Sequence, residues 1–274
     1  MIQRWRGTLK GFKDIFRYDN WIQLLISRFF FRTRGFNIYY YKKLRIMVNN
    51  KAGDLAGLNE CLLSSMYAQW ISQMNLPTHP VVLDIGAHIG GFALLLKSCG
   101  FHPSKIVLVE MNPNTFKRLW FNMNENFGSV AFCVQAALSN MESQKKIYLG
   151  QGSTSDHVFQ TQPSMGKVQY SIPLKTFDRI FNDYFGVACK KIDVCKMDIE
   201  GSEYDVFLKS TQVKQFQKCS HLIMEIHGTD MQLKKKLVEK LKKIGFSTIQ
   251  PLTDHNEVFW FTRTLRYKKQ SHNL

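Results

Sequence analysis

The sequence predicts an α/β protein with a mostly parallel sheet and an antiparallel final strand. Two observations predict this class. From residue 81 onward, short apolar runs alternate with helical patterns, as they do where helices connect the neighbouring strands of a parallel sheet. The last two apolar runs, residues 246–250 and 257–263, are joined by a polar turn with no helix between them. The final strand is therefore expected to run against its neighbour.

A change of composition at Pro77 and Pro80 separates this α/β domain, residues 76–274, from an N-terminal extension, residues 1–75. The extension shows mixed helical patterns, then a run of aromatic and β-branched residues, then a second helical pattern. These patterns predict, in order, helices within residues 1–35, a hairpin over 36–48 and helical structure over 54–74.

Within the α/β domain, each apolar run predicts a strand and each helical repeat predicts a helix. The expected strands before the final pair cover residues 81–85, 105–110, 129–135, 192–197 and 221–226. The expected helices cover residues 91–98, 114–126 and 229–244, and Gly245 caps the last of them.

Positive charge is concentrated at the N-terminus. The chain carries a net charge of +16, and residues 1–50 hold eleven basic residues against two acidic ones. Aromatic residues such as Trp5, Phe16 and Trp21 lie among these charges, which suits an anionic membrane surface or a lipid-linked phosphate carrier. The alternative is that the aromatic residues pack against the sheet as a helical cap.

The sequence contains no transmembrane or secretory pattern. No apolar run reaches the roughly 18 residues of a spanning helix, and the N-terminus lacks a signal-peptide pattern. The six cysteines are scattered without metal-site spacing, which is typical of reduced thiols. We expect a cytoplasmic protein, peripheral at the inner membrane face if the basic extension binds lipid.

The stretch from Val81 to Gly90 has the strongest local pattern, an apolar strand that runs through an acid into a glycine turn. Small residues let the backbone approach a ligand, and the following helix offers free N–H groups. The Gly-x-x-x-Gly spacing departs from the dinucleotide fingerprint Gly-x-Gly-x-x-Gly. An ordinary tight turn is the alternative. The residues expected to bind a nucleoside cofactor here are Asp84, Gly86, Ala87, His88 and Gly90.

Glu110 ends the next expected strand, twenty residues after Gly90, where an acid can accept hydrogen bonds from ribose hydroxyls. Buried without such a donor, its carboxylate would be costly. Asp84 precedes the glycines, where a carboxylate can face an ammonium group but would repel a pyrophosphate. Together these acids favour S-adenosylmethionine over a nicotinamide dinucleotide.

Six segments resemble, in order and spacing, the FkbM family of methyltransferases. They are residues 81–91 (VVLDIGAHIGG), 107–114 (VLVEMNPN), 136–140 (AALSN), 172–178 (IPLKTFD), 196–207 (KMDIEGSEYDVF) and 223–227 (IMEIH). The resemblance implies a Rossmann-like class I methyltransferase sheet and S-adenosylmethionine as cofactor, and adds Met111 and Ala136 to the cofactor-binding residues. The family usually has Asn where this chain has His88. Many members O-methylate sugars or natural products, so a sugar, glycan or related metabolite is the expected acceptor.

Methyl transfer to a hydroxyl needs an aligned acceptor and a group that removes its proton. Asp198 and Glu200 follow the fourth expected strand and are the expected base and acceptor-orienting groups, with His227 as the alternative base. Glu203 and Glu225 are expected to contact the substrate. The alternatives are a helix N-terminal acid for Glu203 and a structural role for His227. These carboxylates also suit a divalent metal, but no metal is expected.

The leading expectation is therefore an S-adenosylmethionine-dependent O-methyltransferase. A nucleic-acid methyltransferase is one alternative: the charge favours it, but the chain lacks an RNA-binding module and an N/D-P-P-Y/F element, and nucleic acid is not an expected partner. The second alternative is a non-catalytic protein that keeps the cofactor-binding fold. The complete set of expected cofactor-binding residues argues against it. Residues 150–155 (GQGSTS) are expected to form a lid or a plain polar loop.

Overall fold

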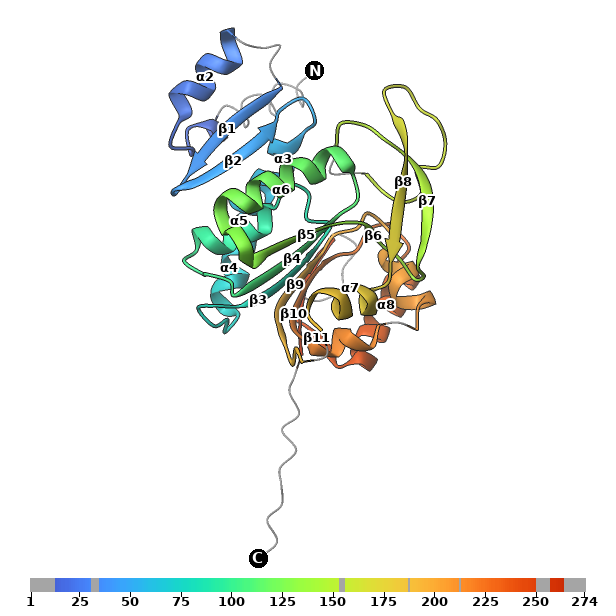
Figure 1. The fold of residues 1–274 in the computed structure, drawn as a ribbon. Coiled ribbons are helices and arrows are strands. Elements are labelled where there is room, and N and C mark those ends of the chain that lie inside the picture. The colour runs from blue at the N-terminus through green and yellow to red at the C-terminus, as the bar shows by residue number, and fades with distance from the viewer. Residues whose placement is uncertain are drawn as a thin grey trace, which may run out of the picture.

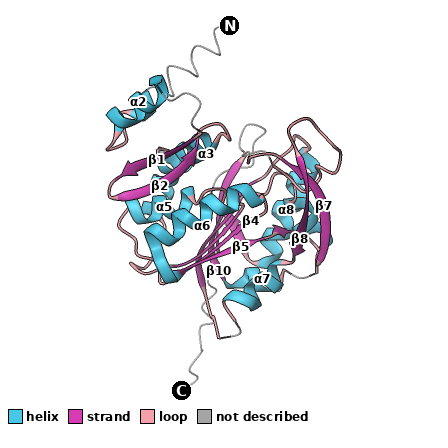
Figure 2. Cartoon of the chain, turned by 45° about the horizontal axis from the view of Figure 1, so that its top comes forward, coloured by secondary structure: helices cyan, strands magenta, loops and turns pink. Residues whose placement is uncertain are grey.

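The computed structural model describes residues 13–30, 35–152, 156–186, 188–211, 213–249 and 257–263. A seven-stranded sheet lies between two layers of helices, and the N-terminal extension packs beside one of these layers (Figure 1). A second view shows the same layers with helix α6 crossing in front of the sheet (Figure 2).

The central sheet has the strand order β11-β12-β10-β9-β3-β4-β5. Its strands are β3 (Val81–Ile85), β4 (Lys105–Glu110), β5 (Ala131–Gln135), β9 (Ile192–Met197), β10 (Cys219–Glu225), β11 (Phe246–Thr248) and β12 (Val258–Arg263). The neighbours from β10 to β5 pair in parallel, and β12 is antiparallel to both β10 and β11. This confirms the predicted Rossmann-like sheet with its antiparallel final strand. The chain order reverses between β3 and β9, which is where such sheets bind ligands at the carboxyl ends of the strands.

Helices cover both faces of the sheet because successive strand residues point to opposite sides. Val82 and Leu108 belong to the core formed with α5 (Gly91–Ser98) and α6 (Pro113–Phe127). Leu83 and Val109 belong to the opposite core, formed with α7 (Phe177–Tyr184) and α8 (Met231–Ile244). Both faces being apolar explains why these strands read as continuous hydrophobic runs rather than as alternating ones.

The N-terminal extension contributes α2 (Trp21–Phe30), β1 (Phe36–Tyr41), β2 (Leu44–Asn49), α3 (Asp54–Leu62) and α4 (Ser65–Gln73). The expected hairpin is confirmed as the antiparallel pair β1–β2. The helical stretch 54–74 is two helices, because the extended backbone of Ser64 interrupts it. Of the helices expected within residues 1–35, α2 is described, while residues 1–12 and 31–34 lie outside the described residues.

The extension shares a core with the α/β domain. Ile46 of β2, Leu58 of α3 and Tyr67 of α4 are buried in the same cluster as the apolar residues of α5 and α6. Polar contacts add to this packing: the Oδ1 atoms of Asn122 and Asn126 on α6 accept hydrogen bonds from the backbone of β2. The extension therefore forms part of the structure that surrounds the carboxyl ends of the strands.

A small sheet of β6 (Ala137–Leu138), β7 (Ser143–Leu149) and β8 (Val168–Lys175) has the order β6-β8-β7 and was not predicted. Residues 153–155 of the expected lid loop lie outside the described part of the chain. The start of that loop is held in place, since Asn114 Nδ2 donates to the carbonyl of Gly150 at 3.0 Å and Arg118 Nη2 to that of Gln151 at 3.0 Å.

All six cysteines are free thiols. No helix within the described ranges has the length and apolar character needed to cross a bilayer.

Candidate active site

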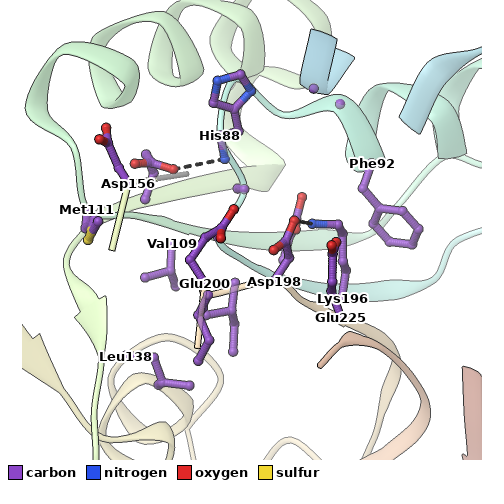
Figure 3. Close-up of a pocket in the computed structure, with 18 of the residues that line it drawn as sticks. His88, Phe92, Val109, Met111, Leu138, Asp156, Lys196, Asp198, Glu200 and Glu225 are labelled. Atoms are coloured by element: carbon purple, nitrogen blue, oxygen red, sulfur yellow. Dashed lines mark hydrogen bonds and ion pairs between the residues drawn. The ribbon is translucent and has the colours of Figure 1, made fainter. Parts of the chain in front are cut away.

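A cleft opens at the carboxyl ends of β3, β4 and β9, where the glycine turn and the acidic residues meet (Figure 3). It encloses about 1150 Å³, including space that is open to solvent. The predicted site residues that line it are Asp84, Gly86, Ala87, His88, Glu110, Met111, Ala136, Asp198, Glu200 and Glu225. The other three, Gly90, Glu203 and His227, do not line it but contact residues that do.

Contacts within the protein determine the conformation of the glycine turn. Gly86 has a φ of 74°, a conformation that disfavours other residues. A Cβ on Gly86 would lie 1.7 Å from the backbone oxygen of Asp198, and the Asp198 N–H donates to the carbonyl of Ile85 at 2.9 Å. The sequence predicted that Gly86 makes room for a ligand. The structure adds that Gly86 also makes room for the turn after β9.

Glu110 holds the two loops on either side of the cleft. Its Oε2 accepts a hydrogen bond from the His88 N–H at 3.0 Å, and its Oε1 accepts one from the Asn112 N–H at 2.7 Å. Burial raises the pKa of Glu110 to about 8, against the effect of these two donors. Each carboxylate oxygen can accept a second hydrogen bond, which is what ribose hydroxyls would supply.

Asp84 is fully buried, and neither of its oxygens has a hydrogen-bond partner among the described residues. Burial raises its pKa to about 6, while Lys196 on the neighbouring strand β9 opposes the shift. Lys196 itself is buried and its Nζ lies 3.2 Å from Asp198 Oδ2. An unpartnered buried carboxylate needs a donor, and the ammonium group of a methionine moiety fits that need. The residues present thus fit S-adenosylmethionine.

His88 serves the cleft through its backbone. Its ring points away from Asp198 and Glu200 (Figure 3), and its Nε2 lies 3.5 Å from Asp54 Oδ1 on α3. Burial lowers the pKa of His88 to about 4, so the ring is neutral near pH 7. The backbone of His88 therefore shapes the cleft, while its ring lies near Asp54 of the extension with no hydrogen-bond partner for Nε2 among the described residues.

His227 lies at the centre of four carboxylates. Its Nε2 is 3.3 Å from Glu200 Oε2, 3.4 Å from Glu225 Oε1 and 3.9 Å from Asp198 Oδ1. Its Nδ1 is 3.1 Å from Oε1 of Glu203, which is fully buried. Two separate segments of the chain, residues 198–203 and 225–227, supply these groups, so their convergence comes from the fold and not from local sequence. We call these five residues the acidic cluster.

The acidic cluster gives two of its titratable groups, His227 and Glu200, different charges near neutral pH. Burial opposes charge on His227, but hydrogen bonds from the ring to Glu203 and Glu225 outweigh it and raise its pKa to about 11. Burial raises the pKa of Glu200 to about 7, against the attraction of His227. Near neutral pH, His227 is an imidazolium and Glu200 is a carboxylate able to take a proton. Glu203 lies behind the ring, so the substrate contact expected for it is replaced by a role in orienting His227.

A divalent metal is the alternative occupant of this cluster. Ligand atoms of Asp198, Glu200 and His227 all lie within 4.8 Å of one another, and oxygen-rich sites of this kind suit hard cations. A metal on Nε2 would have to displace the proton that the surrounding carboxylates stabilise.

Several residues of the cleft were missed by sequence reasoning. Gly57, Glu60, Cys61 and Tyr67 of the extension form one wall, and no motif marked them because they reach the cleft only through the packing of α3 and α4 against α5. Lys196 could have been noticed from the sequence, since a lysine inside the buried strand β9 needs an acid as partner.

Comparison with known proteins places these features in context. The model of a family described as "Methyltransferase FkbM domain" matches residues 84–258. Methyltransferase sdnD from Sordaria araneosa is 24% identical over 178 residues, which make up 55% of this chain and 68% of that protein.

Two solved structures are similar at a lower level. Methyltransferase FkbM from Methylobacillus flagellatus is 15% identical and has a TM-score of 0.42, and the match covers 78% of this chain and 59% of that one. The tRNA m1G37 methyltransferase of M. jannaschii is 14% identical with a TM-score of 0.44, and the match covers 84% of this chain and 57% of that one.

Proposed function

The chain belongs to the FkbM family of S-adenosylmethionine-dependent methyltransferases, and we propose that it methylates a hydroxyl of a sugar, a glycan or a related metabolite. One observation carries this proposal. The residues that fit the cofactor and a carboxylate with a pKa of about 7 line the same cleft. A cofactor site and a proton acceptor in one cleft are what O-methylation requires.

Bound S-adenosylmethionine supplies a methyl group carried on a positively charged sulfur. Asp84 would accept hydrogen bonds from its ammonium group, and Glu110 would accept them from its ribose hydroxyls. Met111 and Ala136, which line the same part of the cleft as Glu110, would contact the adenosine. Asp84 would thereby gain the donor that it lacks in the free protein, and Glu110 would gain donors beyond the two N–H groups that it already holds.

Glu200 acts as the general base. S-adenosylmethionine would supply the methyl group to the acceptor oxygen, and Glu200 Oε2 would take the proton that the hydroxyl loses. The imidazolium of His227, 3.3 Å from the same oxygen, holds Glu200 in place, and Glu203 fixes the direction of the ring by accepting a hydrogen bond from Nδ1. Asp198 and Glu225 accept hydrogen bonds from other hydroxyls of the acceptor.

The charge of the cleft supports a polyol as the acceptor. Although the chain carries +16, the cleft lining holds, among the described residues, seven acids and one lysine, Lys196; the acids are Glu60, Asp84, Glu110, Asp156, Asp198, Glu200 and Glu225. Sugar hydroxyls can donate to several carboxylates, whereas a nucleic-acid phosphate near them would be repelled.

Six free cysteines support a reducing compartment such as the cytoplasm.

The proposal is tested by transferring a labelled methyl group to a panel of free sugars, nucleotide sugars and transfer RNA, with and without EDTA. We expect the label on a sugar oxygen and no loss of rate with EDTA. Glu200→Gln should lower the rate by about 10²–10⁴, while the exposed Glu239→Gln on α8 leaves it unchanged. Label on transfer RNA, or an unaffected Glu200→Gln variant, would contradict the proposal.

A further inference from the structure

Helix α2 turns an apolar face away from the protein. Ile22, Ile26 and Phe30 are spaced four residues apart and therefore share one side of the helix, and they are 57%, 48% and 78% exposed. Phe29 lies on the same side and is 61% exposed. A surface helix that only covers a domain presents polar residues to water, so the pattern of α2 is reversed.

Polar contacts on the opposite side of α2 fix this orientation. Asn20, at the start of the helix, donates through Nδ2 to the carbonyl of Ile38 at 2.8 Å. One and two turns further along, Leu24 is buried and Ser27 Oγ donates to Asn37 Oδ1. This side is thereby fastened to β1, so the apolar face cannot turn inward without breaking these contacts.

Exposed aromatic residues also flank α2 along the chain. Phe16 is 56% exposed with its ring 5.2 Å from that of Trp21, and Phe36 at the start of β1 is 57% exposed. Figures 1 and 2 both show the β1–β2 hairpin between α2 and the helices α5 and α6, so α2 lies at the periphery. Exposed apolar surface gathered in this way marks an interaction site. The outer face of α2 is defined here as Ile22, Ile26, Phe29 and Phe30, and Phe16 and Phe36 are exposed aromatic residues of the segments that precede and follow it.

The charge around the outer face selects one kind of partner. Lys13 and Arg17 precede α2, and Lys42 and Lys43 form the tip of the neighbouring hairpin; all four are exposed. Residues 1–50 carry eleven basic and two acidic residues. Apolar side chains framed by cations match the acyl boundary and headgroups of an anionic bilayer. A second copy of the chain would instead bring like charges together.

We propose that the outer face of α2 inserts into the interfacial layer of an anionic membrane, with the basic residues of the extension against the lipid headgroups. A helix of ten residues is about 15 Å long, which is too short to span a bilayer core of about 30 Å. Because its exposed apolar residues share one side, α2 lies in the membrane plane. Membrane binding through α2 is independent of the reaction in the cleft.

Vesicle sedimentation of the full chain tests the proposal. The outer-face variant is Ile26→Glu with Phe30→Glu. The matched control is Met141→Glu with Met165→Glu, which introduces the same charges at apolar positions that are 57% and 103% exposed elsewhere. The milder pair Ile26→Gln with Phe30→Gln removes the apolar surface without adding charge. Calorimetric affinity for S-adenosylhomocysteine, expected to be the same in all four proteins, verifies the fold.

We expect the parent and the control to bind phosphatidylcholine vesicles that contain phosphatidylserine. Both outer-face variants should bind these vesicles more weakly, by a factor of about ten or more. Binding should also fall on pure phosphatidylcholine and at high salt. The proposal is overturned if the parent does not bind anionic vesicles, or if outer-face and control variants bind alike. It is equally overturned if the parent is a dimer that the outer-face substitutions dissociate, since a second copy would then cover the face.

Discussion

The pH dependence of cofactor affinity follows from the environment of Glu110. In the free protein, burial raises the pKa of Glu110 to about 8, so the group is mostly protonated at pH 7. Ribose hydroxyls donate to the ionised form and therefore lower this pKa in the complex. Between the two pKa values, binding releases one proton, and the Kd for S-adenosylhomocysteine should fall about tenfold per pH unit up to pH 8 and then level off.

The variant Glu110→Gln separates this effect from other groups. An amide keeps one acceptor oxygen but turns its NH₂ toward the N–H of His88 or Asn112, which costs about 1–3 kcal/mol, or about 5- to 150-fold in affinity at pH 8. Its Kd should be flat between about pH 6 and 8, while Asp84, whose pKa is about 6, still weakens binding in more acidic solution.

Titration calorimetry at a series of pH values, in buffers of differing ionisation enthalpy, measures both the Kd and the proton released. A parent Kd that is flat from about pH 6 to 8, or an equal slope in Glu110→Gln, would show that Glu110 does not meet the ribose.

Two further predictions concern stability, measured by urea unfolding. Gly86→Ala should lower the free energy of unfolding by about 1–3 kcal/mol more than Gly186→Ala, and it should abolish S-adenosylhomocysteine binding. Both glycines have φ near 70°, but of the two only Gly86 has backbone atoms where the new Cβ would lie. Equal losses would show that the turn relaxes around the new side chain. Asp54→Asn should cost about 3–5 kcal/mol, because it leaves buried Arg118 without its counter-charge, whereas Asp205→Asn, in an exposed pair, should cost less than about 1 kcal/mol. A small loss for Asp54→Asn would mean that water reaches Arg118.

The sequence predicted the parts of the fold in which local pattern and burial agree. Strands β3, β4 and β9 and helix α5 are found at the predicted residues because both sheet faces are apolar and the glycine turn marks the boundary. The small sheet escaped prediction because β7 and β8 are buried on one side only, and polar residues interrupt their apolar positions. The break at Ser64 escaped it because helical residues continue on both sides.

Part of the candidate site could likewise be predicted from the sequence, and part could not. Asp84 and Glu110 lie at the ends of their strands, and Gly86 and Glu200 follow strand ends, so their meeting at one edge of the sheet could be predicted from chain order alone. The placement of Glu203 behind His227 could not be predicted, because it depends on how two segments that are 24 residues apart in the sequence pack together. The same holds for the wall supplied by α3 and α4, whose residues reach the cleft through tertiary packing only.

The pH profile of kcat, at saturating S-adenosylmethionine and sugar acceptor, tests the reaction centre most directly. Glu200 must be ionised to accept the proton and its pKa is about 7, so kcat should rise about tenfold per pH unit in acid and level off above about pH 7. Glu200→Gln should lower the plateau by about 10²–10⁴ and remove the inflection, with cofactor affinity retained. A Glu200→Gln enzyme that keeps both the plateau and the inflection would contradict the assignment of Glu200 as the base.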